Sequence, residues 1–316
     1  MNIFDTHSDT PFELFRGKLD LYNDITNISL DKIEKFDKKI FVSAFFSDNN
    51  KSDGECFEEF LESSEYFDGL VKEHEHKVAT CKTSEDIKEC SDREICGIIK
   101  AIEDVRLLEG RLDRLDILQN MGVRQIIPVW GGESHIGGAW DTDVGLHSFG
   151  KEVVQKCESL GIIVDVSHMS QKSFYDTAEH SDKPFVASHS NYADICSHGR
   201  NLKKDQLCEI IRRGGIVGLN LCFKHVKNKY EYSEVTLADD FTGDLVRHIY
   251  YCLEMGGENT VCLGCDWDGT KMSPQISNVS YIDRLYERLI KERISEKVTD
   301  DIFFNNAYNF YIKNIK

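Results

Sequence analysis

Short apolar runs rich in β-forming residues alternate with longer amphipathic stretches along this 316-residue chain. The runs cover residues 2–6, 39–46, 95–102, 123–130, 162–166, 184–188, 215–221 and 260–265. Helical patterns lie between them, near residues 55–76, 111–120, 149–160, 170–180, 203–213, 238–255 and 279–293, and a last helix is expected from about Ser295. Eight strands that alternate with helices predict parallel βα units, and their spacing fits a (β/α)8 (TIM) barrel with long loops.

A doubly wound sheet is the main alternative, and periodicity alone does not separate the two folds. The polar residues separate them better, because the working residues of an α/β barrel stand at the carboxyl ends of its strands. Such groups follow five of the runs, as Asp5-Thr6-His7-Ser8-Asp9, Glu103, Asp165-Val166-Ser167-His168, Ser188-His189-Ser190 and Asp266-Trp267-Asp268. His7 and Asp266 come from opposite ends of the chain and must meet in one site. We therefore predict a single (β/α)8 barrel catalytic domain of the metal-dependent hydrolase type over residues 1–316, with a C-terminal helical extension.

The side chains at these strand ends predict two metal sites. His7 and Asp9 are two residues apart, so an extended chain points both the same way, and imidazole with carboxylate suits zinc or a similar first-row metal. His168 and His189 follow neighbouring runs and are candidates for a second ion, and the two oxygens of Glu103 are candidates for a bridge. A metal pair about 3.5–4 Å apart would hold a shared hydroxide as the nucleophile.

Two further residues have predicted roles in the same site. Asp266 is not needed as a ligand, and a carboxylate beside a metal-bound water is a natural proton shuttle. Asp268 stands directly before Gly269 and is expected to shape a turn. The net charge of −17 means that a local cation must catch any anionic ligand. Arg200 lies in the loop after the sixth run, where its guanidinium would hold a substrate carboxylate bidentately.

Composition and missing motifs exclude several other classes of protein. So acidic a chain is a poor binder of nucleic acid or of anionic membranes. No stretch is apolar enough for a transmembrane helix and no signal peptide is recognisable, so we expect a cytoplasmic protein. The eleven cysteines read as reduced thiols, and strand periodicity sends Cys262 and Cys265 to opposite faces rather than to a shared metal. Neither a GxSxG elbow nor a nucleotide-binding glycine motif occurs.

The motifs together resemble the membrane (renal) dipeptidase family, the binuclear zinc peptidases of family M19 in the amidohydrolase-type barrel group. The matching segments follow the family's order: Asp5 to Pro11, Ile102-Glu103, Gly122-Val123-Arg124, Asp165 to His168, Ala187 to Ser190, Arg200-Asn201-Leu202 and Gly264 to Gly269.

The resemblance implies a metallo-dipeptidase with two Zn²⁺ ions that hydrolyses the peptide bond of dipeptides, including those with a C-terminal D-residue. It places His7 and Asp9 on one zinc, His168 and His189 on the other, and Glu103 between them. It also implies that Asp266 contacts the bridging water and that Arg200 holds the C-terminal carboxylate of the dipeptide. A homodimer is a further suggestion of the resemblance.

One position departs from the mammalian pattern of the family. A substrate-contacting histidine is expected after the fourth run, where this chain has Trp130. An indole N–H donates one hydrogen bond but is neither a cation nor an acceptor. Either Trp130 contacts the substrate in another way, or His135 in the following loop reaches into the site. The departure leaves open an alternative, an amidohydrolase that acts on another small amide such as an N-acyl amino acid or a lactam.

Overall fold

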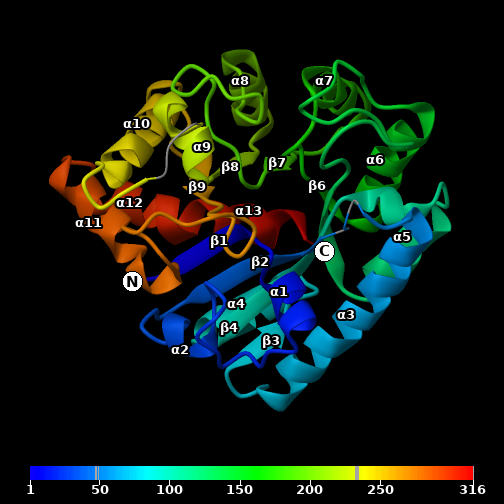
Figure 1. Cartoon of the computed structure of the whole chain (residues 1–316), viewed down its shortest axis with the longest axis horizontal. Coiled ribbons are helices and arrows are strands. Elements are labelled where there is room, and N and C mark those ends of the chain that lie inside the picture. The colour runs from blue at the N-terminus through cyan, green and yellow to red at the C-terminus, as the bar shows by residue number, and fades with distance from the viewer. Residues whose placement is uncertain (47, 49, 232–234, 316) are drawn as a thin grey trace.

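Parallel strands form the centre of the molecule in the computed structural model, which describes residues 1–46, 48, 50–231 and 235–315 (Figure 1). The strands are β1 Ile3–Ser8, β2 Lys39–Phe46, β3 Val78–Thr80, β4 Cys96–Glu103, β5 Val123–Ile127, β6 Ile163–Val164, β7 Val186–Ala187, β8 Ile216–Leu219 and β9 Val261–Leu263. Their order is β6-β5-β4-β2-β1-β9-β8-β7, with β3 beside β4. A parallel bridge between Asp165 and Val186 joins the two ends of this order. The predicted (β/α)8 barrel is thus confirmed as a nearly closed barrel of eight parallel strands.

Helices connect the strands and surround them. They are α1 Thr10–Gly17, α2 Leu30–Ile33, α3 Asp53–Glu73, α4 Ser84–Asp92, α5 Asp113–Asn120, α6 Ser148–Leu160, α7 Gln171–His180, α8 Lys204–Arg213, α9 Phe223–Val226, α10 Phe241–Glu254, α11 Asp283–Lys291, α12 Glu296–Asp300 and α13 Asn306–Asn314. Short 3₁₀ turns are η1 Val105–Leu108, η2 Asn228–Glu231 and η3 Val279–Tyr281, and a π-helical turn, η4 Asp301–Asn305, precedes α13. Among the described residues, no helix combines the length and the apolar composition that crossing a membrane requires.

The eight predicted runs correspond to β1, β2 and β4 to β9, whereas several short elements were not predicted. These are β3, α1, α2, α4 and α9. Three of them, β3, α2 and α9, have three or four residues, which is too short for a period to emerge. Helix α1 begins two residues after the end of β1, so the polar residues between them mark both the end of the strand and the start of the helix.

Side chains of the strands alternate between two apolar layers. On β2, Ile40 and Val42 belong to the cluster inside the barrel, whereas Phe41 and Phe45 belong to the larger cluster between barrel and helices. This alternation follows from the two-residue period of a strand. The same rule places Cys262 in the inner cluster and Cys265 in the outer one, as their spacing predicted.

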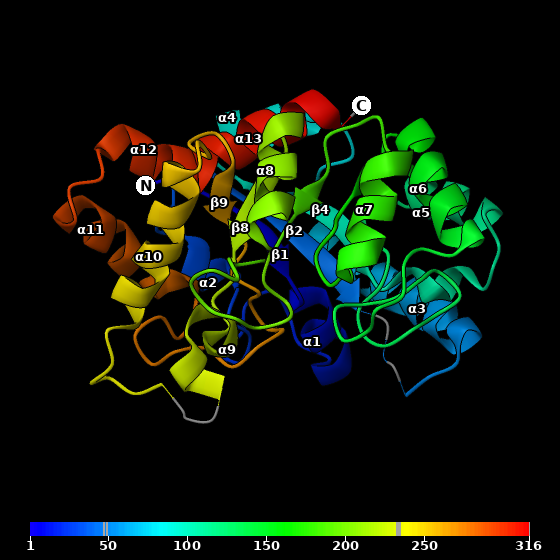
Figure 2. The ribbon, with the colours of Figure 1, turned by 90° about the horizontal axis from the view of Figure 1, so that it is seen from above.

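Helix α13 closes the barrel at the end where the strands begin. Figure 2 shows α13 at one end of the strands and α1 and α9 at the other. The Tyr311 ring stacks on Phe4 inside the barrel, with 5.0 Å between the ring centroids. Its hydroxyl donates to Gln125, and the Gln125 amide donates to Asp165 at 2.9 Å. A polar chain therefore runs from the last helix through the barrel toward the carboxyl ends of the strands.

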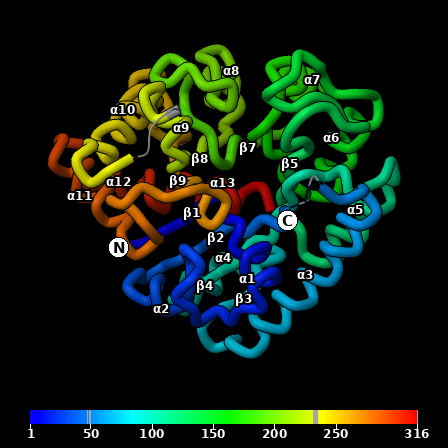
Figure 3. The backbone as a smooth tube through the Cα atoms, viewed as in Figure 1, coloured from blue at the N-terminus to red at the C-terminus, as the bar shows by residue number. Residues whose placement is uncertain are grey.

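The first and last strands of the barrel are neighbours. Figure 3 shows β1 beside β9, and Asp5 pairs with Leu263. Close to this seam, Gly218 and Gly264 leave space for the carbonyl oxygen of Ser188. A Cβ atom would lie 1.9 Å from that oxygen on Gly218 and 1.7 Å from it on Gly264. No side chain fits at either position, so the two glycines are a steric requirement of the barrel.

Replacing Gly264 with alanine should therefore destabilise the protein by about 3 kcal/mol or more, because backbone atoms must move. Gly69→Ala is the matched control, since a Cβ on Gly69 of α3 meets nothing within 4 Å. That change should stabilise the helix by about 0.5–1 kcal/mol. Chemical denaturation of the two variants measures both effects. Equal free energies of unfolding would contradict the steric argument.

Candidate active site

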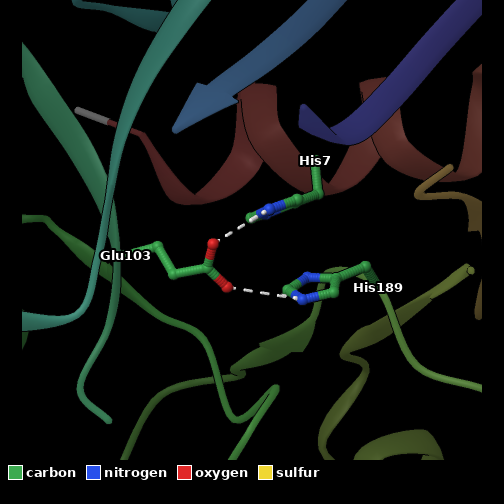
Figure 4. A group of neighbouring side chains, drawn as sticks. All are labelled: His7, Glu103 and His189. Carbon is green, nitrogen blue, oxygen red and sulfur yellow. Dashed lines mark ion pairs between the residues drawn. The ribbon is translucent and has the colours of Figure 1, made fainter. Parts of the chain in front are cut away.

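Glu103 stands at the centre of a buried polar group inside the mouth of the barrel. It ends β4 and continues the inward row of Ile99 and Ala101. Its two carboxylate oxygens face different imidazoles, as Figure 4 shows for His7 and His189. Oε2 lies 3.5 Å from Nε2 of His7, whereas Oε1 lies 3.5 Å from Nε2 of His189.

A further ligand candidate accompanies each of these imidazoles. The Asp9 carboxylate lies 3.4 Å from Nε2 of His7. On the other side, Nε2 of His168 lies 3.0 Å from Oε1 of Glu103 and 2.9 Å from Nε2 of His189. The structure thus brings together all five residues that the sequence predicted as metal ligands, in two groups that share Glu103.

The donor atoms of these groups fit metal ions better than they fit one another. Nε2 of His7, Oδ1 of Asp9 and Oε1 of Glu103 are buried without a hydrogen-bond partner among the described residues. Nδ1 of His168 lies 2.9 Å from the carbonyl oxygen of Trp130 and must carry the proton, since a carbonyl only accepts. The lone pair of Nε2 then points toward His189. Unpaired buried lone pairs that converge on one space are what a cation stabilises.

Two buried carboxylates beneath the ligands hold the strand ends in place. Asp5 accepts hydrogen bonds from the backbone N–H groups of His7 and Cys265 and from the indole N–H of Trp267. It thereby ties the end of β1 to the segment after β9.

Asp165 does the same on the other side of the barrel. It accepts from the N–H of Ser167, directly before His168, and from the N–H of Ser188, directly before His189. No role was predicted for Asp5 or Asp165 from the sequence patterns. Their position two or three residues before a histidine was the available signal.

Three residues of the site have left-handed backbone conformations that side chains other than glycine adopt rarely. They are His168, Asp266 and Asp268, with φ of 67°, 64° and 66°. Each such conformation costs on the order of 1–3 kcal/mol and persists where its surroundings impose it. Here the hydrogen bonds at the strand ends impose these conformations. Part of the free energy of folding is therefore used to hold the candidate ligands in position.

Electrostatic interactions within the group shift the pKa values of its members in opposite directions. Burial alone would lower the pKa of His7, but the carboxylates of Glu103 and Asp9 raise it well above its ordinary value. Burial and Glu103 raise the pKa of Asp9 to about 7. Burial and the charge of Arg200 lower the pKa of His168 to about 4. Without metal, His7 is therefore protonated at pH 7, while His168 is neutral.

Asp266 lies beside this group, as the sequence predicted. Its Oδ1 is 3.9 Å from Nε2 of His7, and its Oδ2 accepts a hydrogen bond of 3.2 Å from the Asn220 amide. Burial and Glu103 raise the pKa of Asp266, although His7 and Arg200 oppose this. A carboxylate with a raised pKa at the edge of a cavity is suited to accept and return a proton. Asn220 orients this carboxylate, and no pattern in the sequence indicated a role for Asn220.

A cavity of about 460 Å³ opens above the group and has an aromatic wall. Phe12, Phe46 and Trp130 line it, with centroid distances of 5.5 Å between the first two rings and 5.2 Å between the last two. The Trp130 ring also stacks on His168 at 5.8 Å. Trp130 therefore contacts both the cavity and a candidate ligand, so its ring restricts the space that a bound molecule can occupy.

Arg200 lines a second cavity, of about 270 Å³, which meets the first at His168. The guanidinium is buried, and its Nε has no hydrogen-bond partner among the described residues. Within the described residues the guanidinium makes one hydrogen bond, of 3.4 Å, from a terminal nitrogen to the carbonyl of His189. A guanidinium with so few hydrogen bonds at the wall of the second cavity is available to bind an anion.

His135 is placed elsewhere, contrary to the expectation that it reaches into the substrate cavity. Its Nδ1 lies 3.3 Å from the Asp53 carboxylate at the start of α3, and its Nε2 accepts from the N–H of Gly110 at 3.3 Å. Both ring nitrogens are engaged there. Instead, His225 of the unpredicted helix α9 lines the cavity. No pattern in the sequence indicated a role for His225.

Buried imidazoles and carboxylates at the carboxyl ends of barrel strands define the class of metal-dependent TIM-barrel hydrolases. The particular family follows from the sequence, since a model of the membrane dipeptidase family, peptidase family M19, matches residues 1–310. The chain belongs to this family and is a metal-dependent dipeptidase.

Individual relatives agree with this family. The "uncharacterized protein in pqqA 5′region" of Klebsiella pneumoniae is 30% identical over 247 residues, which are 75% of this chain and 89% of that protein. An "uncharacterized dipeptidase" of Schizosaccharomyces pombe is 26% identical over 318 residues, or 92% of this chain and 74% of that protein.

Two solved structures share the fold over the whole chain. The crystal structure of "dipeptidase AC" superimposes with a TM-score of 0.94 at 23% identity and covers 100% of this chain and 99% of that chain. A metallo peptidase from Rhodobacter sphaeroides, "liganded with phosphinate mimic of dipeptide L-Ala-D-Ala", has a TM-score of 0.92 at 22% identity and the same coverage.

Zinc binding to the metal-free protein should release protons near pH 7, because Nε2 of His7 must lose its proton before it can coordinate. Asp9, with a pKa of about 7, contributes a further fraction. The zinc affinity should therefore fall as the pH is lowered through 7. Calorimetric titration in two buffers with different ionisation enthalpies counts the protons. His147→Gln, outside the site, should release the same number, and zinc binding without proton release would contradict the pKa directions.

Proposed function

We propose that the chain hydrolyses dipeptides with two zinc ions, one held by His7 and Asp9, the other by His168 and His189, and both by Glu103. The observation that carries this proposal is the division of the Glu103 carboxylate, whose two oxygens face separate imidazole groups. Metal–ligand distances of about 2.0–2.2 Å leave donor atoms of one site about 3–3.5 Å apart, which matches the spacings within each group. Three imidazoles and two carboxylates are also the donor types that zinc prefers.

Zinc ions bound there would lower the pKa of a water molecule and polarise the carbonyl of the scissile bond. Asp266 takes the proton that the water loses as its oxygen adds to the carbonyl carbon. The same carboxyl group then delivers this proton to the amine nitrogen as the C–N bond breaks. Asn220 keeps Asp266 aimed at the reacting atoms through the bond to its Oδ2.

The two ends of the substrate meet opposite charges in this arrangement. Arg200 binds the C-terminal carboxylate, and the free amino group lies near Asp9 in the acidic cavity. Recognition of the carboxylate by a guanidinium does not fix the stereochemistry of the residue that carries it. We therefore expect dipeptides with a C-terminal D-residue to be substrates as well.

The proposed compartment is the cytoplasm. All eleven cysteines are free thiols, and ten of them are buried. Thiols in such numbers persist where the redox poise is reducing.

Replacing Asp266 with asparagine should lower kcat by about 100-fold or more while both metals remain bound, because the amide cannot accept a proton. Metal analysis and turnover of a simple dipeptide measure the two effects separately. Asp116→Asn, at a surface ion pair with Lys156, is the control and should change neither. Turnover that survives Asp266→Asn would exclude the proton-transfer role.

Replacing Arg200 with alanine should raise KM for dipeptides by about 10- to 100-fold, since a charge-assisted pair is lost. The effect on the C-terminal amide of the same dipeptide should be far smaller. Arg111→Ala, which removes a surface guanidinium paired with Asp113, is the control. Equal effects of Arg200→Ala on acid and amide would show that Arg200 does not bind the carboxylate.

A further inference from the structure

His225 is a histidine of the cavity that the proposed mechanism leaves unused. It lines the 460 Å³ cavity together with His168 and Asp266. Unlike His168, it has no acidic side chain within ion-pair distance among the described residues. Its ring nitrogens also make no hydrogen bond within the described part of the chain. A cavity-lining imidazole without a protein partner is free to bond to a ligand.

The backbone of His225 is fixed by the loops that carry the site. Its carbonyl oxygen accepts from the side-chain amides of Asn191, at 3.3 Å, and Asn201, at 2.8 Å. Asn191 follows the candidate ligand His189 by two residues, and Asn201 directly follows Arg200. The Asn191 amide also donates to the carbonyl of Asn220, the residue that orients Asp266. The position of His225 is therefore set by residues of the loops that carry the reacting groups.

A second contact relates His225 to Arg200. The ring of His198 packs against the ring of His225, with 4.5 Å between the centroids, and Nδ1 of His198 accepts from the backbone N–H of Arg200 at 3.2 Å. Burial, followed by the positive charge of Arg200, lowers the pKa of His225 well below its ordinary value. The ring is therefore neutral and offers one N–H donor, and His198 connects its position to that of Arg200.

We propose that His225 donates a hydrogen bond to the C-terminal carboxylate of the bound dipeptide, alongside Arg200. A carboxylate has about four acceptor sites, more than one guanidinium fills, so an imidazole N–H and a guanidinium bind it together without competing. His225 is then a substrate-binding residue that selects free dipeptides over blocked or longer chains. The inference rests on the proposed function, because it requires that a dipeptide carboxylate occupies this end of the site.

His225→Phe tests the proposal, since phenylalanine keeps a ring of similar size and removes the N–H donor. It should raise KM for a dipeptide about 10-fold and leave kcat within about twofold. For the C-terminal amide of the same dipeptide, KM should change less than twofold. His225→Gln, which restores a donor, should recover most of the affinity. His147→Gln is the control for a histidine outside the cavity and should change no parameter.

The combination with Arg200→Ala gives an independent measurement. If both residues bind one carboxylate, the effects of His225→Phe and Arg200→Ala on KM should combine to less than their product. Fully multiplicative effects, or equal effects of His225→Phe on acid and amide, would overturn the proposal. A loss of metal or a lower melting temperature in His225→Phe would point to a structural role of the ring. His225→Gln then decides, because its amide keeps a donor. A KM near that of the wild type in a stable His225→Gln would retain the donor role, and a KM as high as that of His225→Phe would exclude it.

These outcomes are distinguishable from a failure of the proposed function. If the wild-type protein with two zinc ions hydrolyses neither the dipeptide nor its amide, the proposed function fails. Calorimetric binding of a phosphinate dipeptide analogue, with and without a free carboxylate, still measures His225 in that case. Equal affinities of wild type and His225→Phe for the free carboxylate form would overturn the proposal on their own.

Discussion

Two buried carboxylates, Asp5 and Asp165, hold together the strand ends on which the candidate ligands stand. The barrel is least regular at the same places, because β6 and β7 have two residues each and meet through a single bridge. Asp165 substitutes for the missing ladder by accepting two backbone N–H groups from the segments that carry His168 and His189. The pKa of Asp5 is raised to about 6 by burial, which its hydrogen bonds only partly oppose. Binding geometry and barrel closure thus depend on the same buried groups.

The rest of the site follows from this framework. Backbone positions fixed by Asp5 and Asp165 impose unfavourable conformations on the residues that follow and bring imidazoles and carboxylates within 3–4 Å of one another. Such a collection of buried lone pairs is stable only with bound cations or protons. The pKa values of His7 and Asp9 are both raised, so protons stabilise these groups when no cation is bound. Metal ions and protons therefore compete for the same nitrogen and oxygen atoms of His7 and Asp9.

The sequence was sufficient to predict the barrel and the residues that converge at its mouth, because short stretches of sequence carry the signals for both. Strand periodicity identified the eight barrel strands, and metal-binding side chains stood directly at their ends. The places of His225 and His135 escaped prediction because they depend on contacts between distant segments. His225 lies on a four-residue helix whose position is set by Asn191 and Asn201, and no local pattern encodes such contacts. His135 looked suitable from its loop, yet Asp53 and Gly110, far apart in sequence, hold it elsewhere.

The pairing of β1 with β9 has a consequence for how the chain is made. Asp5 and Leu263 lie side by side, yet a ribosome releases them in order, with the whole of the intervening chain between. Throughout synthesis, one edge of β1 lacks its neighbour and His7 lacks Asp266. The nascent chain therefore exposes an apolar strand edge without a partner, which favours association with other chains and gives a chaperone a surface to cover. Activity can appear only after the last strand has left the exit tunnel.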